Sequence, residues 1–203
     1  LDAMAGEFVA CGEEPVVQAD WVATPFAMAD PDFTGSEGIF VLKSSSEGLV
    51  TWITWYRTET DEPSAEAVAA NSDHVAAAMA TCAAIEGYHI VRDADEYLAL
   101  MGDDPAIHSI PNDYHTVGEE GVRRTVELYP YGDDIGCVDR TTGTATWSVV
   151  GMTLDNYGYG IALEGPAVHR HAEDGIAAIY HHWTNAAMSP SLRPGIWGTA
   201  PAP

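Results

Sequence analysis

Four of the eight histidines lie in one stretch near the C-terminal end, and two of them stand in a motif with metal-binding character. His169 and His171 are followed closely by two acidic residues in the segment HRHAED. Imidazole and carboxylate groups are common Zn²⁺ ligands, and a catalytic zinc site needs three converging ligands. His108 or His115, from a distant segment, would have to supply the third. The motif suggests a zinc-dependent hydrolase, but we favour the simpler interpretation that these are ordinary polar histidines.

The second pair, His181 and His182, falls in a segment whose apolar residues recur at helical spacing. The members of this stripe are Ile176, Ile179, Tyr180, Trp183 and Ala187. They predict an amphipathic helix over residues 172–188. Neighbouring residues on a helix point about 100° apart, so His181 and His182 are not expected to face one metal ion.

A second metal hypothesis concerns calcium. Asp30, Asp32, Thr34 and Gly35 match the opening of a D-x-D-x-[ST]-G calcium loop. The twelfth position of that loop is Val41, where a bidentate glutamate is expected, and no helix pair is predicted around it. We therefore favour an Asp-Pro turn stabilised by its own side chains over a calcium site.

Other catalytic motifs are missing from the sequence. There is no GxSxG elbow, no phosphate-binding Walker loop and no GxGxxG fingerprint. Trp52, Trp55, Trp147 and Trp183 could line a sugar or peptide cleft, although aromatic residues more often fill the core of a small sheet-and-helix domain. We therefore expect a protein without enzymatic activity and without a cofactor.

The charge balance excludes several classes of partner. The chain has 203 residues, of which 46% are hydrophobic, so it can form one well-filled core. Its 31 acidic residues against 8 basic ones give a net charge of −23. Such a charge repels phosphate backbones and anionic lipid surfaces, which argues against nucleic acid and membrane-surface partners. No run of 18 apolar residues is present, so no transmembrane segment is predicted.

The three cysteines bear on the cellular compartment. Residues 1–11 have neither a basic start nor an apolar core, and the chain does not begin with Met, so we expect a processed, extracytoplasmic product. In an oxidising compartment one disulfide is expected, and Cys11 with Cys82 is the preferred pair, leaving Cys137 free. The alternative is three reduced, buried thiols.

The remaining pattern predicts an α+β fold: a single domain over residues 1–188, with a mostly antiparallel sheet and two main helices packed on it. The first helix is expected over 64–84 with Ser64 as N-cap, and the second over 172–188. Strands are expected at 38–43, 49–58, 122–129 and 144–154, and a long loop at 102–121. The proline-rich tail, residues 189–203, is expected to be extended, with Trp197 as a candidate docking residue for a partner.

Three segments carry a resemblance to a known family: SAEAVAANSDHVAAAMATCAA, TATWSVVGMTLDNYGYGIALEG and DGIAAIYHHW. In this order the chain resembles the extracellular sensor domain of mycobacterial receptor serine/threonine kinases and related actinobacterial lipoproteins. The resemblance implies a disulfide-held antiparallel sheet with packed helices, which would suit the pair Cys11 and Cys82. It also implies ligand sensing or binding rather than catalysis. We therefore expect an exported domain that binds a small ligand or a protein partner at the cell envelope, or that serves as an accessory subunit of an envelope complex.

Overall fold

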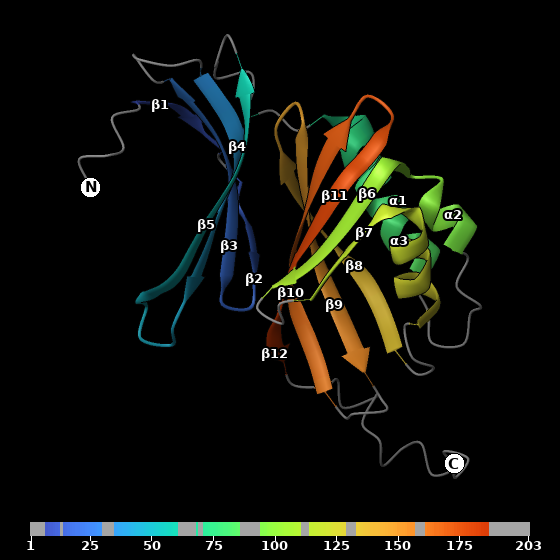
Figure 1. Cartoon of the computed structure of the whole chain (residues 1–203). Helices are drawn as coiled ribbons and strands as arrows, with labels where there is room; N and C mark the ends of the chain where they lie inside the picture. Colours follow the sequence, from blue (N-terminus) through green and yellow to red (C-terminus); the bar gives the residue numbers. More distant parts are fainter. Residues whose placement is uncertain are drawn as a thin grey trace.

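The chain forms two β-sheets and a layer of helices in the computed structural model (Figure 1). The structure describes residues 7–12, 14–29, 35–60, 68, 71–85, 94–110, 114–128, 133–156 and 161–186. The predicted α+β class is confirmed, but the prediction of one sheet with two helices is wrong. The strands that precede the first helix form a sheet of their own, and three helices are described.

The N-terminal sheet is entirely antiparallel. Its strands are β1 (Glu7–Cys11), β2 (Val16–Gln18), β3 (Trp21–Ala29), β4 (Gly35–Ser44) and β5 (Val50–Thr60). β1 and β2 both pair with β3, and the order continues through β4 to β5. Pro25 lies within β3 and pairs with Ile39 of β4. It sits opposite the break between β1 and β2, so its missing N–H removes no bond from the ladder.

The C-terminal sheet follows the first two helices in sequence. Its strands are β6 (Met101–Ile110), β7 (Tyr114–Val117), β8 (Asp133–Gly143), β9 (Trp147–Asn156), β10 (Ile161–Ala172), β11 (Gly175–His182) and β12 (Thr184–Ala186). The order is β7-β6-β11-β10-β9-β8, and β12 pairs with β10. β6 and β11 are parallel, while the other neighbours are antiparallel.

The helices α1 (Ser72–Ile85), α2 (Ala94–Leu98) and α3 (Gly118–Leu128) cover one face of the C-terminal sheet (Figure 1). Asn71 caps α1, because its Oδ1 accepts from the backbone N–H of Asp73 at 2.9 Å. The predicted cap, Ser64, lies outside the described residues. Buried apolar side chains fill the space between helices and sheet, among them Ala78, Tyr97, Ile107, Val126 and Ile179. No described helix is both long and apolar enough to cross a membrane.

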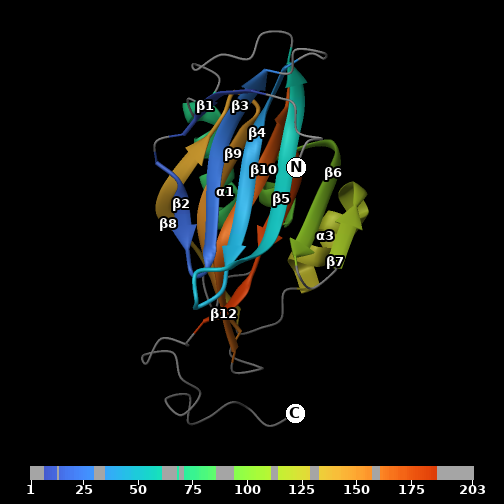
Figure 2. The same cartoon turned by 90° about the vertical axis from the view of Figure 1, so that its left-hand side faces the viewer.

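The N-terminal sheet covers the opposite face of the C-terminal sheet, so the molecule has three layers (Figure 2). The core between the sheets contains Val16, Trp21, Ile39, Val41, Tyr56, Trp147, Val149 and Val168. Strands β2 and β3 contact β8, β9 and β10, whereas β6 and β7 lie beyond the margin of the N-terminal sheet at β5 (Figure 2). Among the described residues, part of this face of the C-terminal sheet therefore has no second sheet over it.

Polar contacts fasten the two sheets together at both ends. Near one end the buried carboxylate of Glu37 accepts from the Thr146 backbone N–H at 3.1 Å and from the Thr144 and Thr146 hydroxyls. Near the other, the Trp21 indole N–H donates to the Thr184 hydroxyl at 2.9 Å, and that hydroxyl donates to Asp20. These bonds satisfy groups that burial would otherwise leave unpaired.

The disulfide joins Cys82 on α1 to Cys137 on β8, with a Cα–Cα distance of 5.8 Å. The predicted pair Cys11 and Cys82 is therefore wrong, and Cys11 is an exposed free cysteine. The reason is the packing of α1 on β8, which brings together residues 55 apart in sequence. Cys11 lies on β1 in the other sheet.

The helix predicted over 172–188 is wrong. Its described residues form the end of β10, then β11 and β12. β11 lies between the helices and the N-terminal sheet, so both of its faces are buried. A strand buried on both faces loses the alternation of apolar and polar residues, and its apolar positions can then match a helical stripe.

The structures of two further segments differ from those predicted. The long loop predicted over 102–121 is β6, β7 and the start of α3, with residues 111–113 outside the described part. The strand predicted over 122–129 is mostly α3, because Val122 and Val126 are buried one helical turn apart while Arg123 and Glu119 pair on the exposed side. Asp30, Asp32 and the tail 189–203 with Trp197 lie outside the described residues.

Candidate functional site

Strand alternation divides the C-terminal histidines between the two faces of one sheet. His169 and His171 on β10 and His181 on β11 face the helices, since His171 stacks on His74 of α1 and His181 contacts Trp183 in the helix-side core. His182 faces the other way, toward the N-terminal sheet, where it contacts Trp21 and Tyr56. Adjacent histidines therefore belong to two separate environments.

The helix-side group consists of His74, His169, His171 and His181. The rings of His74 and His171 stack with their centroids 4.0 Å apart and an interplanar angle of 2°. The His171 Nε2 lies 2.8 Å from the hydroxyl oxygen of Ser148, and the His169 Nε2 lies 3.5 Å from that of Thr81. Because Ser148 and His169 are fully buried, these contacts belong to the interior.

Burial keeps the imidazoles of His169, His171 and His181 neutral. It lowers the pKa of His171 to about 4, with a further contribution from His74, and it lowers the pKa of His181 to about 4. For His169, burial and then the neighbouring His171 and His181 hold the pKa well below its ordinary value. Desolvation disfavours the charged form of a histidine, and neighbouring imidazoles add to the effect.

The predicted zinc ligands do not converge. The ring centroids of His169 and His171 are 6.5 Å apart, whereas two imidazoles on a tetrahedral zinc have centroids roughly 5 Å apart. His108 and His115, the proposed third ligands, lie on β6 and β7. His108 stacks on Tyr180 on the opposite face, and the His115 ring lies beside His108. Across the described part of the chain, no three His, Cys, Asp or Glu residues are arranged to hold a metal ion.

The opposite face carries a row of aromatic rings that runs from the surface into the core. Its members, which we call the aromatic row, are His115, His108, Tyr180, Tyr56 and His182. The centroids of His115 and His108 are 6.2 Å apart, those of His108 and Tyr180 4.9 Å, and those of Tyr180 and Tyr56 4.4 Å. His108 lies nearly parallel to Tyr180, at 8°.

The inner end of the row is a hydrogen-bonded pair. The Tyr56 hydroxyl lies 3.0 Å from the Nε2 of His182, and both residues are buried. Burial raises the pKa of Tyr56 and lowers the pKa of His182 to about 3, so both groups are neutral. In either tautomer the His182 Nδ1 has no hydrogen-bond partner among the described residues.

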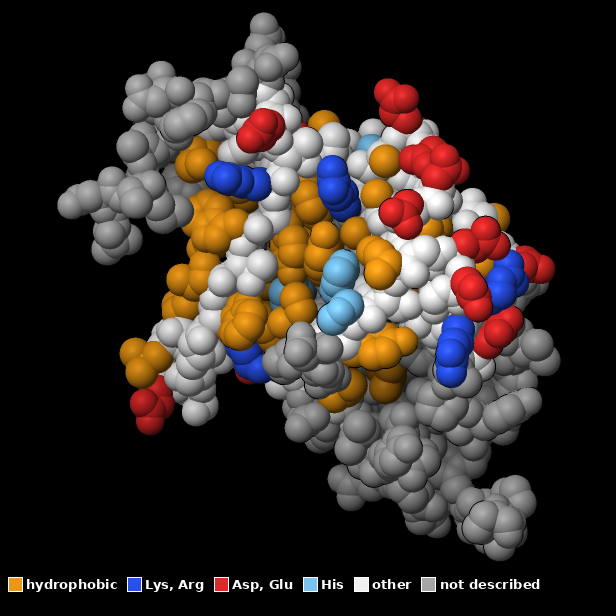
Figure 3. Space-filling model, in the orientation of Figure 1, with side chains coloured by type: hydrophobic (Ala, Val, Ile, Leu, Met, Phe, Trp, Pro, Cys, Tyr) orange, Lys and Arg blue, Asp and Glu red, His pale blue; other side chains and the backbone are white. Residues whose placement is uncertain are grey.

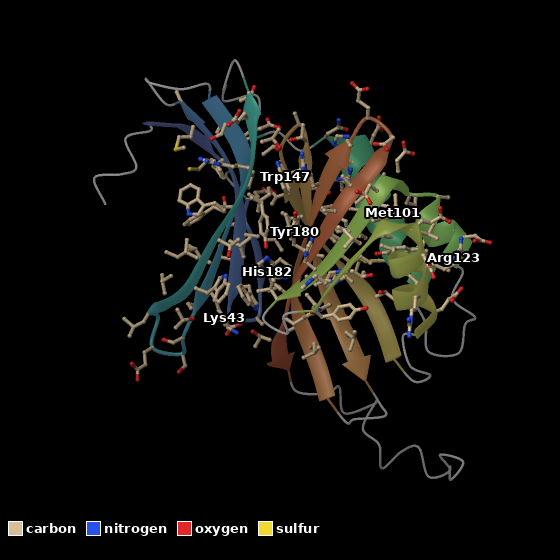
Figure 4. All side chains as sticks on the ribbon, in the orientation of Figure 1. Lys43, Met101, Arg123, Trp147, Tyr180 and His182 are labelled. Atoms are coloured by element: carbon tan, nitrogen blue, oxygen red, sulfur yellow. A yellow bond between two sulfur atoms is a disulfide. The ribbon has the colours of Figure 1, made fainter. Side chains whose placement is uncertain are left out.

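Local sequence explains how β5, the strand that carries Tyr56, lies so close to β4. Tyr56 pairs with Ile39 on β4, and the residue before Ile39 is Gly38. A Cβ atom at Gly38 would lie 1.8 Å from the Tyr56 carbonyl oxygen. Only glycine permits this close approach of β5 to β4. Figure 4 shows the neighbouring Trp147, Tyr180 and His182 in a column between the two sheets.

The outer end of the row reaches solvent. His115 is exposed, and His108 and Tyr180 are partly exposed, because the N-terminal sheet does not extend over β6 and β7. Burial, and then His115, lowers the pKa of His108. Burial raises the pKa of Tyr180, while the positive charge of Arg170 acts in the opposite direction. On this face of the space-filling view the histidines lie among hydrophobic side chains, with acidic groups toward the rim (Figure 3).

A surface pocket of about 380 Å³ lies elsewhere, against α2, α3 and β6. Asp95 and Glu119 on its wall are already paired with Arg123, at 2.6 Å and 3.4 Å. The Asp174 carboxylate accepts from the Asp103 backbone N–H at 2.7 Å, joining the β10–β11 turn to β6. These acidic groups therefore have structural partners of their own.

Sequence reasoning missed the most informative residues of the row. Tyr56 was placed in a strand without a role, and Tyr180 was assigned to a helical stripe. The available signal was the segment IYHHW, which in a strand sends Tyr180 and His182 to one face and His181 and Trp183 to the other. Of the four tryptophans considered, Trp147 and Trp183 are core residues, while Trp52 is 44% exposed.

No protein-family model matches the chain, and no curated protein matches its sequence. Solved structures match it in part. An NTF-2 like protein of unknown function from Burkholderia xenovorans LB400 is 12% identical, with a TM-score of 0.47, and the match covers 63% of this chain and 94% of that chain. A delta 5-3-ketosteroid isomerase from Mycobacterium sp. is 16% identical, with a TM-score of 0.46, covering 57% and 100%. A protein with a ketosteroid isomerase-like fold from Catenulispora acidiphila DSM 44928 is 11% identical, with a TM-score of 0.44, covering 56% and 86%.

Proposed function

We propose that this protein is a non-enzymatic binding domain whose ligand is a small planar molecule bearing an oxygen acceptor. The ligand lies on the outer end of the aromatic row, against His108 and His115. The observation that carries the proposal is the near-parallel stack of His108 on Tyr180, open to solvent at His115 and close to Arg170.

The stacked rings favour a planar ligand. Aromatic faces attract other flat rings, and each offset-stacked pair contributes about 0.5–1.5 kcal/mol beyond the area that it buries. His108 is already oriented by Tyr180, and Tyr180 is supported by Tyr56. A ligand that adds a ring to this row does not have to order the side chains first, which lowers the entropic cost of binding.

Arg170 favours an oxygen acceptor at one end of that ligand. Its guanidinium acts on the Tyr180 hydroxyl, is exposed, and presents several N–H donors. A carboxylate, phenolic or carbonyl oxygen above Tyr180 would accept from it. His108 has a lowered pKa, so at neutral pH it offers a neutral ring rather than a second charge.

The cellular setting is also part of the proposal. A disulfide between α1 and β8 favours an oxidising compartment, since such bonds are rare in proteins of the reducing cytosol. We therefore propose that the domain lies outside the cytoplasm, at the cell envelope. There it binds its ligand as a sensor-like module or as an accessory subunit of an envelope complex. The docking role of Trp197 stays a prediction from the sequence.

Isothermal titration of the full chain with 2-naphthoate tests the binding proposal, with cyclohexanecarboxylate as a probe that has the acceptor but no aromatic face. We expect saturable binding of 2-naphthoate only. His108→Ala should weaken the binding of 2-naphthoate about tenfold, because the variant lacks the ring on which the ligand stacks. Arg170→Gln should weaken 2-naphthoate by a similar factor.

Tyr114→Ala is the matched control, because Tyr114 is 49% exposed on β7 but bonds Thr125 of α3 on the helix side. It should leave the affinity unchanged. Equal binding of the two probes, or equal losses in the Tyr114 and His108 variants, would contradict the proposed site.

A further inference from the structure

The longest strand of the N-terminal sheet lies at its edge with no described strand beyond it. β5 comprises the eleven residues Val50–Thr60, and β4 is its one partner among the described strands. Figure 2 shows it at the margin of the sheet. An edge strand presents a row of backbone N–H and C=O groups that another strand can pair with, and natural proteins usually protect such edges with charges, bulges or short length.

β5 has little of this protection. Val50, Trp52 and Ile53 are 54%, 44% and 54% exposed, and Leu49 beside them is 63% exposed. In a chain of net charge −23, the strand itself is neutral, since Arg57 and Glu59 are its only charged residues. Its single register shift lies at the Val50 end, where it pairs with Ser44. A long, neutral and apolar edge is a docking site for another strand.

The other sheet edges are protected. At the far edge of the same sheet, β1 and β2 have five and three residues, and β1 contains a register shift between Phe8 and Ala10. In the C-terminal sheet β7 has only four residues, and β8 contains a shift between Val138 and Thr141. Short length and bulges discourage pairing at all three.

We propose that two copies of this chain pair through their β5 strands, antiparallel and symmetric about Trp55. In this register residue i of one copy lies opposite residue 110 − i of the other, so all eleven residues are paired. The two N-terminal sheets become one continuous sheet across a two-fold axis. A two-fold interface uses the same patch on both copies, and a single neutral strand meets that requirement.

The side chains of β5 are compatible with this register. Trp55 lies on the outer face of the sheet, against Phe26 and Phe40, at 5.2 Å and 4.3 Å. On the axis it would meet the Trp55 of the second copy and join two aromatic clusters, a favourable cross-strand pair. Arg57 lies opposite Ile53 and Glu59 opposite Thr51, so no like charges are opposed. The two Arg57 residues are about 13 Å apart along the strand, beyond the range of strong repulsion in physiological salt.

Sedimentation equilibrium of the full chain tests the pairing. We expect a monomer–dimer equilibrium that shifts toward dimer when the salt is raised from 150 to 500 mM, because salt screens the repulsion between two copies of charge −23. A chain that remains monomeric at millimolar concentration in both salts would overturn the proposal.

Two substitutions at one exposed position test the register. Ile53→Lys places a lysine opposite Arg57 of the second copy, twice per dimer, and should raise the dissociation constant about tenfold or more. Ile53→Glu removes the same apolar group but faces Arg57 with an opposite charge, and should keep the dimer. Circular dichroism and thermal unfolding establish that both variants are folded.

Val17→Lys is the control for the other edge of the same sheet, since Val17 is 44% exposed on β2. It should leave the dissociation constant unchanged. Equal weakening by Ile53→Lys and Ile53→Glu would show that the charge at Arg57 is not opposite Ile53. Weakening by Val17→Lys would show head-to-tail pairing of β5 with β2. Either result overturns the symmetric β5 pair.

Discussion

Both faces of the sheet at β10 and β11 carry histidines, but the two groups of histidines differ in their access to solvent. On the helix side His169, His171 and His181 are buried beneath α1 and surrounded by core side chains. On the other side His182 begins a row of rings that ends at exposed His115. The comparison shows that the covering layer, rather than the histidines themselves, decides which group meets solvent.

The covering layers differ in extent and in attachment. α1 is joined to β8 by the disulfide, which holds it over the helix-side group. The N-terminal sheet stops at β5, short of β6 and β7 (Figure 2). The helix-side histidines His169, His171 and His181 are therefore enclosed in the interior, whereas the aromatic row has an accessible end.

The largest expected effect comes from releasing α1. Cys82→Ala together with Cys137→Ala should reduce the free energy of unfolding by about 2–5 kcal/mol, the usual cost of removing a native disulfide. Removal of the bridge should also accelerate backbone amide hydrogen exchange in α1 more than in β5. Cys11→Ala, at the exposed free cysteine, is the matched control and should change neither quantity. Equal exchange in α1 with and without the bridge would show that the disulfide does not hold the helix-side cover.

Acid should weaken the fold through the helix-side group. The unfolded pKa of histidine is about 6.5, and burial lowers the folded pKa of His181 to about 4. The unfolded chain therefore binds the proton first, and stability that is complete above pH 6.5 is lost as the pH falls toward 4. For His181 alone the loss is about 3 kcal/mol.

Urea unfolding of the wild type and His181→Gln at pH 7.5, 6.0 and 4.5 measures this effect. The variant should be less stable at pH 7.5 but should lose less stability between pH 7.5 and 4.5. Parallel pH profiles for the two proteins would show that His181 is protonated equally easily in the folded and unfolded states.

A smaller effect is expected at the inner end of the aromatic row. Tyr56→Phe removes the hydroxyl that contacts the His182 Nε2 and leaves both ring nitrogens of that buried histidine without a partner among the described residues. We expect a loss of about 1–3 kcal/mol in the free energy of unfolding. Thermal unfolding checks it. A variant as stable as the wild type would show that the pair does not hold the row in place.

The smallest effect is expected at the exposed end of the row. His115→Ala should change the free energy of unfolding by less than about 0.5 kcal/mol, as surface substitutions generally do, while weakening binding of 2-naphthoate. Urea unfolding and calorimetric titration measure the two quantities. A large loss of stability with unchanged affinity would make His115 a structural residue like those on the helix side.

Local patterns predicted the strands that have one polar or exposed face. The segment 49–58 alternates clearly and is β5, and GIFVLK lies in β4. The prediction was wrong for β11 because both its faces are covered, so that Ile176, Ile179, Tyr180 and Trp183 matched a helical stripe. It was wrong for α3 because the buried residues Val122 and Val126 are separated only by the polar residues Arg123, Arg124 and Thr125, a spacing that fits one helical turn.

The candidate site depended on contacts that no local pattern contains. The sequence correctly indicated that the side chains of His181 and His182 point in different directions. The predicted helix would turn them about 100° apart, whereas the strand sends them to opposite faces of the sheet. Cys82 forms a disulfide with Cys137 because α1 packs on β8. His108 was placed in a loop, and its stack on Tyr180 follows from the parallel pairing of β6 with β11.

The most direct test is an NMR titration that follows the imidazole resonances of the histidines while 2-naphthoate is added. Binding on the aromatic row predicts shifts at His108 and His115, with His74, His169, His171 and His181 unchanged. Shifts confined to the helix-side group, with His108 and His115 unchanged, would contradict the account and place the ligand beneath α1.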